Sequence, residues 1–275
     1  MNKSLGFVTI NGKISNTISV FDHGLLYGDG IYETIRIFNG KAFLWDEHLD
    51  RLFSSARAIS LKIPYSKSSL IKMIKSAFVK SKLKDAFLRI VITRGIGKQG
   101  LVSESKPAVI IIVSDREFKP LEKLTLTISK IRRIDKNAID SKIKSLNYLN
   151  NILAKKDALN RKFADALLLN HDNLLTEATT SNLFIVKNGE IFTPSTDSGI
   201  LEGVTRKAIL ENFKVIEKPL SIEELLSADE VFLSGTVNLI TCVKRIDDKS
   251  FSKFEYSKKV LNRLLQITEK GFKLK

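Results

Sequence analysis

Four short polar segments in the second half of the chain carry side chains suited to chemistry on an aldehyde cofactor that bears a phosphate. Lys144 precedes an apolar helical pattern, and Glu177 follows an apolar strand-like run. Gly203 to Arg206 and Ser234 to Val237 are turns that contain glycine and threonine. A lysine amine can bond to an aldehyde, and a carboxylate can keep a pyridine nitrogen protonated. A Gly-X-Thr turn at a helix start can bind phosphate through N–H groups and a hydroxyl.

Each of these signals is weak by itself. Lys144 is one of 45 basic residues, and basic side chains mostly lie on protein surfaces. Glu177 alone is typical of a turn carboxylate, while Gly203 and Gly235 alone are typical of ordinary turns. The order of the four segments and the sequence around them therefore carry the argument.

Three Asn-Gly pairs between apolar segments predict tight β-hairpins, because both turn positions must tolerate positive φ. They are Asn11-Gly12, Asn39-Gly40 and Asn188-Gly189. The segments predicted to pair are 8–10 with the residues from 14 onward, 35–38 with 42–44, and 184–186 with 191–192.

Apolar stripes at helical spacing predict helices between these hairpins. One stripe follows the expected N-cap Asp46, and a short helix is expected at 206–212. Strands recur through both halves without strict βαβ alternation, which favours an α+β fold over a doubly wound parallel sheet. The three stripes are Leu49-Leu52-Phe53-Ala56, Leu70-Ile74-Ala77-Phe78 and Leu146-Leu149-Leu153. The remaining strand-like runs are 88–93, 109–113, 124–129, 166–169 and 231–233.

The composition is that of a globular protein, with 43% hydrophobic and 27% charged residues and a net charge of +15. The lysines are spread over the whole chain and no nucleic-acid motif accompanies them, so we expect a solvated surface and no nucleic-acid partner. No apolar run approaches the roughly 18 residues that span a bilayer, and no signal pattern opens the chain. The one cysteine, Cys242, fits a reducing cytoplasm. We predict no metal site and no membrane partner.

The context of these segments resembles one family over nearly the whole chain. Residues 19–36, SVFDHGLLYGDGIYETIR, are similar to the N-terminal signature of class IV (fold type IV) pyridoxal-5'-phosphate (PLP) enzymes. That family includes branched-chain aminotransferases, D-amino-acid aminotransferases and aminodeoxychorismate lyases. The resemblance continues, in the same order, through 47–52, 143–148, 176–184, 201–206 and 229–236.

The resemblance implies a PLP-dependent enzyme that acts on amino acids and 2-oxo acids. In the family, the lysine that matches Lys144 bonds to the cofactor and moves the Cα proton, and the glutamate that matches Glu177 bonds to the pyridine nitrogen. The arginine that matches Arg51 grips the phosphate, although helix geometry alone favours a solvated residue there. The other cofactor-binding residues implied are Tyr148 near the phenolic oxygen, Leu201 against the ring, and Val204, Thr205, Thr236 and Val237 at the phosphate.

The resemblance also implies a two-domain α+β fold with the cofactor between the domains. We predict an N-terminal α/β domain over residues 1–115, a charge-rich linker over 116–122, and a C-terminal PLP-binding domain over 123–275. Members are usually homodimers in which a loop of the neighbouring chain lines the pocket. A homodimer is therefore expected, although the sequence itself reveals no dimer surface.

The substrate pocket gives mixed indications. Residues matching the pocket of branched-chain aminotransferases favour transfer between branched-chain L-amino acids, glutamate and 2-oxo acids. Thr34 in place of glycine, Phe87 in place of tyrosine and the Ser181-Asn182 pair instead resemble aminodeoxychorismate lyases, which form 4-aminobenzoate and pyruvate, and D-amino-acid aminotransferases. Residues 95–100 lack the Arg-x-His of the best-known D-amino-acid enzymes. The substrate-binding residues predicted are Tyr27, Tyr32, Thr34, Arg36, Arg89, Thr236 and Val237, of which Tyr27 and Tyr32 are also typical of half-buried strand aromatics.

Overall fold

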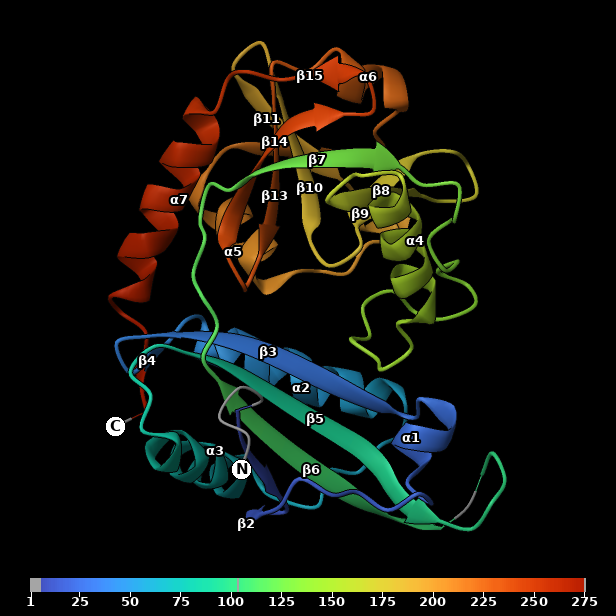
Figure 1. Cartoon of the computed structure of the whole chain (residues 1–275), viewed down its shortest axis with the longest axis vertical. Coiled ribbons are helices and arrows are strands. Elements are labelled where there is room, and N and C mark those ends of the chain that lie inside the picture. The colour runs from blue at the N-terminus through green and yellow to red at the C-terminus, as the bar shows by residue number, and fades with distance from the viewer. Residues whose placement is uncertain (1–5, 103, 275) are drawn as a thin grey trace. The chain divides into compact units, whose positions relative to one another are not determined.

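The computed structural model describes residues 6–102 and 104–274, and the chain divides into two compact units. Unit 1 comprises Met1–Glu117, Ile143–Asn147 and Ile267–Lys275, and unit 2 comprises Phe118–Lys142 and Tyr148–Gln266. Each unit contains its own β-sheet and its own helices (Figure 1). The α+β prediction is therefore confirmed. The boundaries at residues 115 and 123 remain a prediction.

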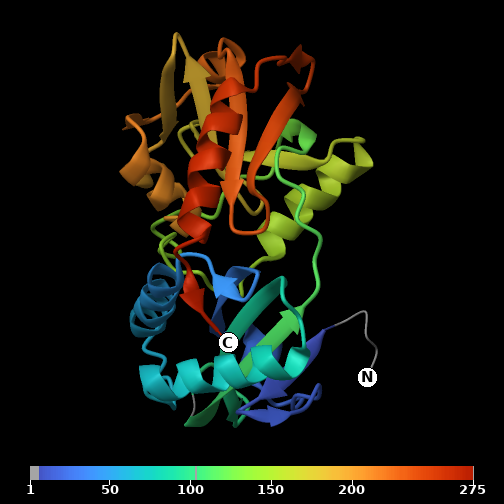
Figure 2. The same ribbon diagram turned by 90° about the vertical axis from the view of Figure 1, so that its left-hand side faces the viewer.

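Unit 1 contains an antiparallel sheet of seven strands in the order β16-β4-β3-β5-β6-β1-β2. Its strands are β1 (Phe7–Ile10), β2 (Lys13–Ile14), β3 (Gly30–Phe38), β4 (Lys41–Ala42), β5 (Ala86–Gly97), β6 (Ser105–Ser114) and β16 (Phe272–Lys273). Its helices are α1 (His23–Tyr27), α2 (Trp45–Ala58) and α3 (Lys67–Ser81). The cyan helix α3 crosses in front of this sheet in Figure 2.

The two faces of this sheet differ in character, because successive strand residues point to opposite sides. On one face, Ile31 and Ile35 of β3 and Leu88 of β5 pack with α2 and α3 in the core of unit 1. The other face carries Tyr32 and Arg89, among others, from the same two strands. The predicted substrate residues of β3 and β5 gather on this second face, which we call the substrate face.

Unit 2 contains a mixed sheet of nine strands in the order β12-β11-β10-β13-β14-β7-β8-β9, with β15 paired to β14. Its strands are β7 (Lys123–Ile128), β8 (Asp165–Leu169), β9 (Leu175–Ala178), β10 (Asn182–Lys187), β11 (Glu190–Pro194), β12 (Val215–Lys218), β13 (Glu230–Gly235), β14 (Leu239–Ile246) and β15 (Lys249–Ser250). Its helices are α4 (Leu149–Asn160), the 3-10 helix η1 (Thr196–Ser198), α5 (Val204–Asn212), α6 (Ile222–Leu226) and α7 (Glu255–Thr268), whose last residues fall in unit 1.

The three Asn-Gly hairpins are confirmed. Asn11, Asn39 and Asn188 have φ of 50°, 46° and 50°, and the glycine after each has φ between 77° and 82°. They connect β1 to β2, β3 to β4 and β10 to β11. Local turn chemistry therefore determined these three strand registers.

The start of α2 corrects two expectations. β4 ends at Ala42 and does not extend to Leu44, because Leu44 adopts a left-handed conformation with φ 46° and is the N-cap of α2. Asp46 is therefore not the cap but lies in the first turn, where its charge favours the helix dipole.

The stripe expected to begin at Leu146 is also wrong as a core-facing pattern. α4 begins only at Leu149, which is 68% exposed, and Leu153 is 47% exposed. Its buried face is made by Asn151, Ala154 and Ala158. The periodicity indicated a helix correctly, but the large apolar residues are on its solvent side.

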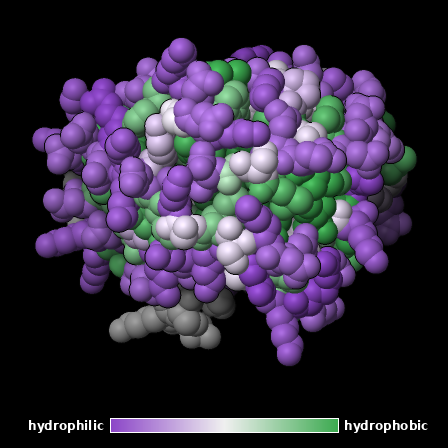
Figure 3. Space-filling view, turned by 90° about the horizontal axis from the view of Figure 1, so that it is seen from above, coloured by the Kyte–Doolittle hydropathy of each residue, from purple (hydrophilic) through white to green (hydrophobic). Residues whose placement is uncertain are grey.

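The surface of the molecule is rich in charge. Hydrophilic side chains cover most of the face seen from above, with a smaller apolar patch among them (Figure 3). In the described part of the chain, no helix combines the length and apolar character needed to cross a bilayer.

Candidate active site

Lys144 lies on a short segment that runs beside β3. The backbone N–H of Tyr32 donates to the carbonyl of Lys144 at 2.9 Å, and the N–H of Leu146 donates to the carbonyl of Gly30 at 3.0 Å. The N–H of Lys144 in turn donates to Ser55 Oγ on α2 at 3.2 Å. Backbone bonds to a strand and a helix thus hold this lysine, so its placement does not depend on its own side chain.

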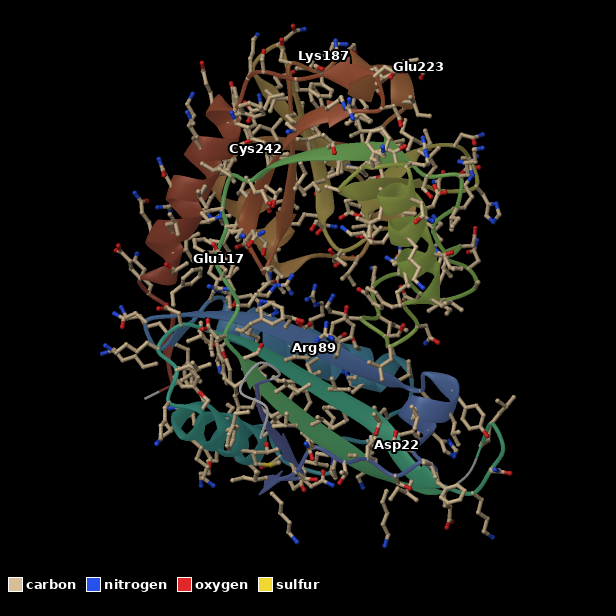
Figure 4. The ribbon with its side chains drawn as sticks, viewed as in Figure 1. Asp22, Arg89, Glu117, Lys187, Glu223 and Cys242 are labelled. Carbon is tan, nitrogen blue, oxygen red and sulfur yellow. The ribbon has the colours of Figure 1, made fainter. Side chains whose placement is uncertain are left out.

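The side chain of Lys144 shares an aromatic wall with an arginine. Its Nζ lies 4.5 Å from the centre of the Tyr32 ring, and the guanidinium carbon of Arg89 lies 4.8 Å from the same centre. Arg89 is labelled on the sheet of unit 1 in Figure 4, and Thr34 is directly opposite it in the sheet register. The substrate face of unit 1 therefore combines a reactive amine, an aromatic surface and a cation suited to a carboxylate.

Arg51 has a partner that the sequence did not suggest. Its Nε and Nη2 donate to the carboxylate of Glu33 at 2.5 and 2.9 Å, and His48 Nδ1 donates to Glu33 Oε2 at 2.7 Å. Burial alone would raise the pKa of Glu33, but the charges and hydrogen bonds of Arg51 and His48 lower it below its usual range. Burial lowers the pKa of His48, so its ring is neutral at pH 7. The phosphate contact expected of Arg51 stays a prediction.

A signal for this cluster was present in the sequence. Glu33 alternates with Ile31 and Ile35, so a strand reading places a carboxylate among core residues. A buried carboxylate requires partners, and the i, i+3 spacing of His48 and Arg51 places both on one face of the neighbouring helix.

Glu177 is buried in unit 2, on β9 and not in a turn. Its Oε1 forms an ion pair with Arg133 Nε at 3.0 Å. Its Oε2 accepts from Asn182 Nδ2 at 3.1 Å and from the Leu201 N–H at 3.2 Å. These are the partners of an ionised carboxylate. Arg133 was missed by the sequence reasoning, because no local pattern connects it to Glu177.

Asn182 joins Glu177 to the segment that enters α5. Its Nδ2 also donates to the Leu201 carbonyl at 2.8 Å. A Cβ on Gly203, the N-cap of α5, would lie 2.0 Å from Asn182 Oδ1, so only glycine fits this close approach. Four predicted cofactor residues, Glu177, Leu201, Val204 and Thr205, are thereby held along one stretch of unit 2.

The N-terminus of α5 fits a phosphate. The first hydrogen bond of the helix runs from Lys207 N to Gly203 O at 2.8 Å, which leaves the preceding N–H groups outside the helical ladder. Thr205 is 2% exposed, and its Oγ1 has no hydrogen-bond partner among the described residues. A buried hydroxyl without a partner next to helix N–H groups is suited to an anion.

A second turn follows β13 in unit 2. Thr236 and Val237 lie in the turn between β13 and β14 and are half-buried. Ser234 Oγ, just before it, is buried and has no hydrogen-bond partner within residues 6–102 and 104–274. A Cβ on Gly235 would come within 3.1 Å of Ser181 Oγ, so this turn too is close-packed.

Three other predicted residues have distinct surroundings. Tyr148 is the half-buried N-cap residue of α4. Arg36 is buried on β3, and its Nη1 donates to the Arg116 carbonyl at 2.7 Å. Tyr27 is 38% exposed at the end of α1, and its hydroxyl accepts from the Gly100 N–H at 3.1 Å.

The chain is similar to known enzymes over most of its length. The family described as "Amino-transferase class IV" matches residues 30–246. A putative branched-chain-amino-acid aminotransferase of Methanocaldococcus jannaschii is 37% identical, with 88% of each chain covered. An aminodeoxychorismate lyase of Bacillus subtilis is 33% identical, covering 89% of this chain and 88% of its own. A D-alanine aminotransferase of Listeria monocytogenes is 34% identical, covering 84% and 83%.

Solved structures show the same fold. The branched-chain amino acid aminotransferase of Escherichia coli superposes with a TM-score of 0.90 at 27% identity, covering 95% of this chain and 94% of its own. A branched-chain amino acid aminotransferase complexed with N-(5'-phosphopyridoxyl)-L-glutamate, from the source abbreviated T.th., has a TM-score of 0.87 at 26% identity, covering 96% and 95%. Fold and sequence thus agree on one class of enzyme. The chain belongs to the class IV aminotransferase family.

Proposed function

We propose that this enzyme uses PLP to transfer an amino group between a branched-chain L-amino acid, glutamate and their 2-oxo acids. The observation that carries the proposal is the placement of Lys144 Nζ and the Arg89 guanidinium 4.5 and 4.8 Å from the centre of the Tyr32 ring. An aromatic wall accepts an aliphatic side chain, and an arginine beside it accepts the second carboxylate of glutamate. The branched-chain aminotransferase relatives support the same substrates.

The described residues fit PLP on the evidence of Thr205, whose buried hydroxyl lacks a partner among them. When bound, PLP supplies an aldehyde that bonds to an amine and a ring that takes up the negative charge left at the substrate Cα. In this proposal Thr205 and the first N–H groups of α5 bind the phosphate, and Glu177 holds the proton on the pyridine nitrogen. Arg133 and Asn182 orient the carboxylate of Glu177.

Lys144 has two tasks in this proposal. It bonds to the cofactor in the resting enzyme, and it removes the Cα proton as a general base once the substrate amine has taken its place. The backbone bonds to Tyr32 and Ser55 hold its main chain while its side chain moves. Tyr32 and Arg89 position the substrate side chain, and Arg36, Thr34 and Tyr27 complete the pocket.

Aminodeoxychorismate lyase activity is the second candidate. Thr34 and the Ser181-Asn182 pair favour it, as does the 33% identity to the B. subtilis lyase. The same lysine would then release pyruvate and 4-aminobenzoate instead of completing amino transfer. D-amino-acid transfer is the third candidate, supported by the D-alanine aminotransferase relatives.

A homodimer in the cytoplasm is part of the proposal. Unit 1 has an exposed apolar surface formed by α1, the residues before it and the 96–102 segment; its most exposed members are Val20, Phe21, Leu25, Leu101 and Val102, from 50% to 96%. Contiguous exposed apolar surface indicates a protein contact, and a second copy would cover it. Burial raises the pKa of the Cys242 thiol, which favours the reduced form expected in the cytoplasm.

A half-reaction experiment tests the function directly. The yellow holoenzyme is mixed in turn with L-leucine, L-glutamate, D-alanine and aminodeoxychorismate, and the absorbance of the cofactor is recorded. We expect L-leucine and L-glutamate to convert the spectrum. Conversion by D-alanine alone, or release of pyruvate and 4-aminobenzoate from aminodeoxychorismate alone, would replace the proposed substrates with those of the third or second candidate.

A further inference from the structure

Arg116 lies just after β6 and belongs to no site assigned above. Its carbonyl accepts the hydrogen bond from Arg36 Nη1 at 2.7 Å, which fixes its backbone beside β3. Its guanidinium carbon lies 5.2 Å from the centre of the Phe87 ring. The side chain is exposed, and none of the carboxylates in the described part of the chain forms an ion pair with it.

The strand register places Arg116 on the substrate face. Phe87, on which its guanidinium stacks, is opposite Arg36, and Arg89 is two residues farther along β5 and opposite Thr34. Phe87 and Arg89 therefore point to the same side of the sheet. Arg89 likewise forms no ion pair with a carboxylate among the described residues, so two guanidinium groups with no carboxylate partner line one face.

The spacing along β3 separates the tasks of the two arginines. Arg89 shares the Tyr32 ring with Lys144, so it serves a carboxylate one short side chain from the reacting carbon. Arg116 stacks near Arg36, four residues and about 13 Å of strand from Tyr32. An acid that reaches Arg116 must therefore extend farther from Lys144 than one that reaches Arg89.

The charge around Arg116 is only partly compensated. Asp85 and Asp115 raise the pKa of Arg36, whereas burial first, and Arg116 second, lower it. These two carboxylates therefore offset one buried guanidinium, while Arg89 and Arg116 remain available to an anion. Stacking on Phe87 orients the Arg116 guanidinium without consuming its N–H donors.

We propose that Arg116 determines specificity for acidic amino donors, binding a side-chain carboxylate that extends beyond the reach of Arg89. The inference rests on the proposed amino transfer and names a substrate class for it: α-amino dicarboxylic acids, with a preference that grows with side-chain length. Arg116 acts on the substrate and not on the cofactor.

Arg116→Met tests this, because methionine keeps an apolar stem against Phe87 and the backbone carbonyl for Arg36 while removing the charge. The kcat/KM of the holoenzyme is measured with L-leucine, L-glutamate and L-2-aminoadipate. We expect the 2-aminoadipate/leucine ratio to fall about fivefold to tenfold, and the glutamate/leucine ratio to fall less, as for one partly exposed charge-assisted pair. Arg116→Lys should restore most of the ratio.

A binding measurement separates this inference from the proposed function. Adipate and 4-methylvalerate are titrated into the holoenzyme, and heat is recorded at low and high salt. We expect Arg116→Met to weaken adipate about fivefold or more relative to 4-methylvalerate, with the control Arg57→Met, an exposed arginine of α2, binding both like the wild type. Equal losses for acidic and neutral ligands, or none, would overturn the role of Arg116. Failure of every amino donor alongside selective adipate binding would overturn only the amino transfer.

Discussion

Replacing Glu33 with glutamine should strongly destabilise unit 1, because four N–H groups converge on this carboxylate inside the core. Arg51 provides two of them, at 2.5 and 2.9 Å, His48 provides one at 2.7 Å, and the Thr34 backbone provides one at 3.2 Å. Glu33 and His48 are both 0% exposed. Removing one partner of a buried ion pair costs about 3–5 kcal/mol, since the charge left behind keeps its desolvation penalty. The Arg51 side chain is 13% exposed, which favours the lower end of that range.

The loss should depend on pH with a definite sign. A carboxyl whose folded pKa is lowered, as that of Glu33 is by Arg51 and His48 against the opposing effect of burial, stabilises the fold above its unfolded pKa near 4.5. That stability is lost as the pH falls below 4.5. The pKa of His48 is lowered by burial, so protonation of the unfolded chain below pH 6.5 destabilises in the same direction. Glu33→Gln should therefore lose the acid sensitivity below pH 4.5.

Trp45 makes the assay specific to unit 1. It is the one tryptophan of the chain, is 3% exposed and stacks on Phe272 with ring centres 4.9 Å apart. Urea unfolding followed by its fluorescence gives the free energy of unfolding at each pH. The control is Asp50→Asn, which breaks an exposed ion pair with Lys67 and should cost at most about 1 kcal/mol. A loss no greater than that of the control, or an unchanged response below pH 4.5, would refute the reasoning.

Three further predictions concern the cofactor. Lys144→Ala should abolish turnover and eliminate the borohydride-trapped adduct that mass spectrometry finds on its peptide; an adduct on a different lysine would contradict the assignment. Glu177→Gln should retain PLP but slow Cα-proton removal about a hundredfold in stopped-flow absorbance, because an amide cannot stabilise the ring proton. An unchanged rate would mean that another group holds that proton. Thr205→Val should weaken PLP about tenfold by equilibrium dialysis, with Thr205→Ser near the wild type, since one hydrogen bond to a charged phosphate is lost. Equal affinities of both variants would exclude the hydroxyl from the phosphate site.

Features set by neighbouring residues could be predicted from the sequence. The Asn-Gly pairs fixed three hairpins because their left-handed backbone is a local requirement. The helix start at Gly203 was also predictable, since glycine, a following threonine and a helical pattern occur together. The α+β fold followed from strands that recur through both halves of the chain.

Features set by distant residues could not be predicted. Glu33 is paired with residues 15 and 18 positions away, and Glu177 with Arg133 across 44 positions, 177 minus 133. No periodicity encodes such pairs. The apolar stripe of α4 misled for another reason: Leu149 and Leu153 are exposed, while alanines form the packed side. Hydrophobic spacing shows that a helix has an apolar face, but not which surface that face contacts.

The register of β3 connects the stability of unit 1 to its chemistry. Odd-numbered residues such as Ile31 and Glu33 point into the core, and even-numbered residues such as Tyr32 point to the substrate face. Shifting the strand by one residue would expose Glu33 and bury Tyr32, since side chains alternate with a period of two. The Asn39-Gly40 turn holds this register at one end, and the hydrogen bond from Tyr32 N to Lys144 O holds it at the other. Because that second bond belongs to the lysine itself, any change that shifts β3 also moves the reactive amine. The buried ion pair of Glu33 therefore protects the placement of Lys144 as well as the fold.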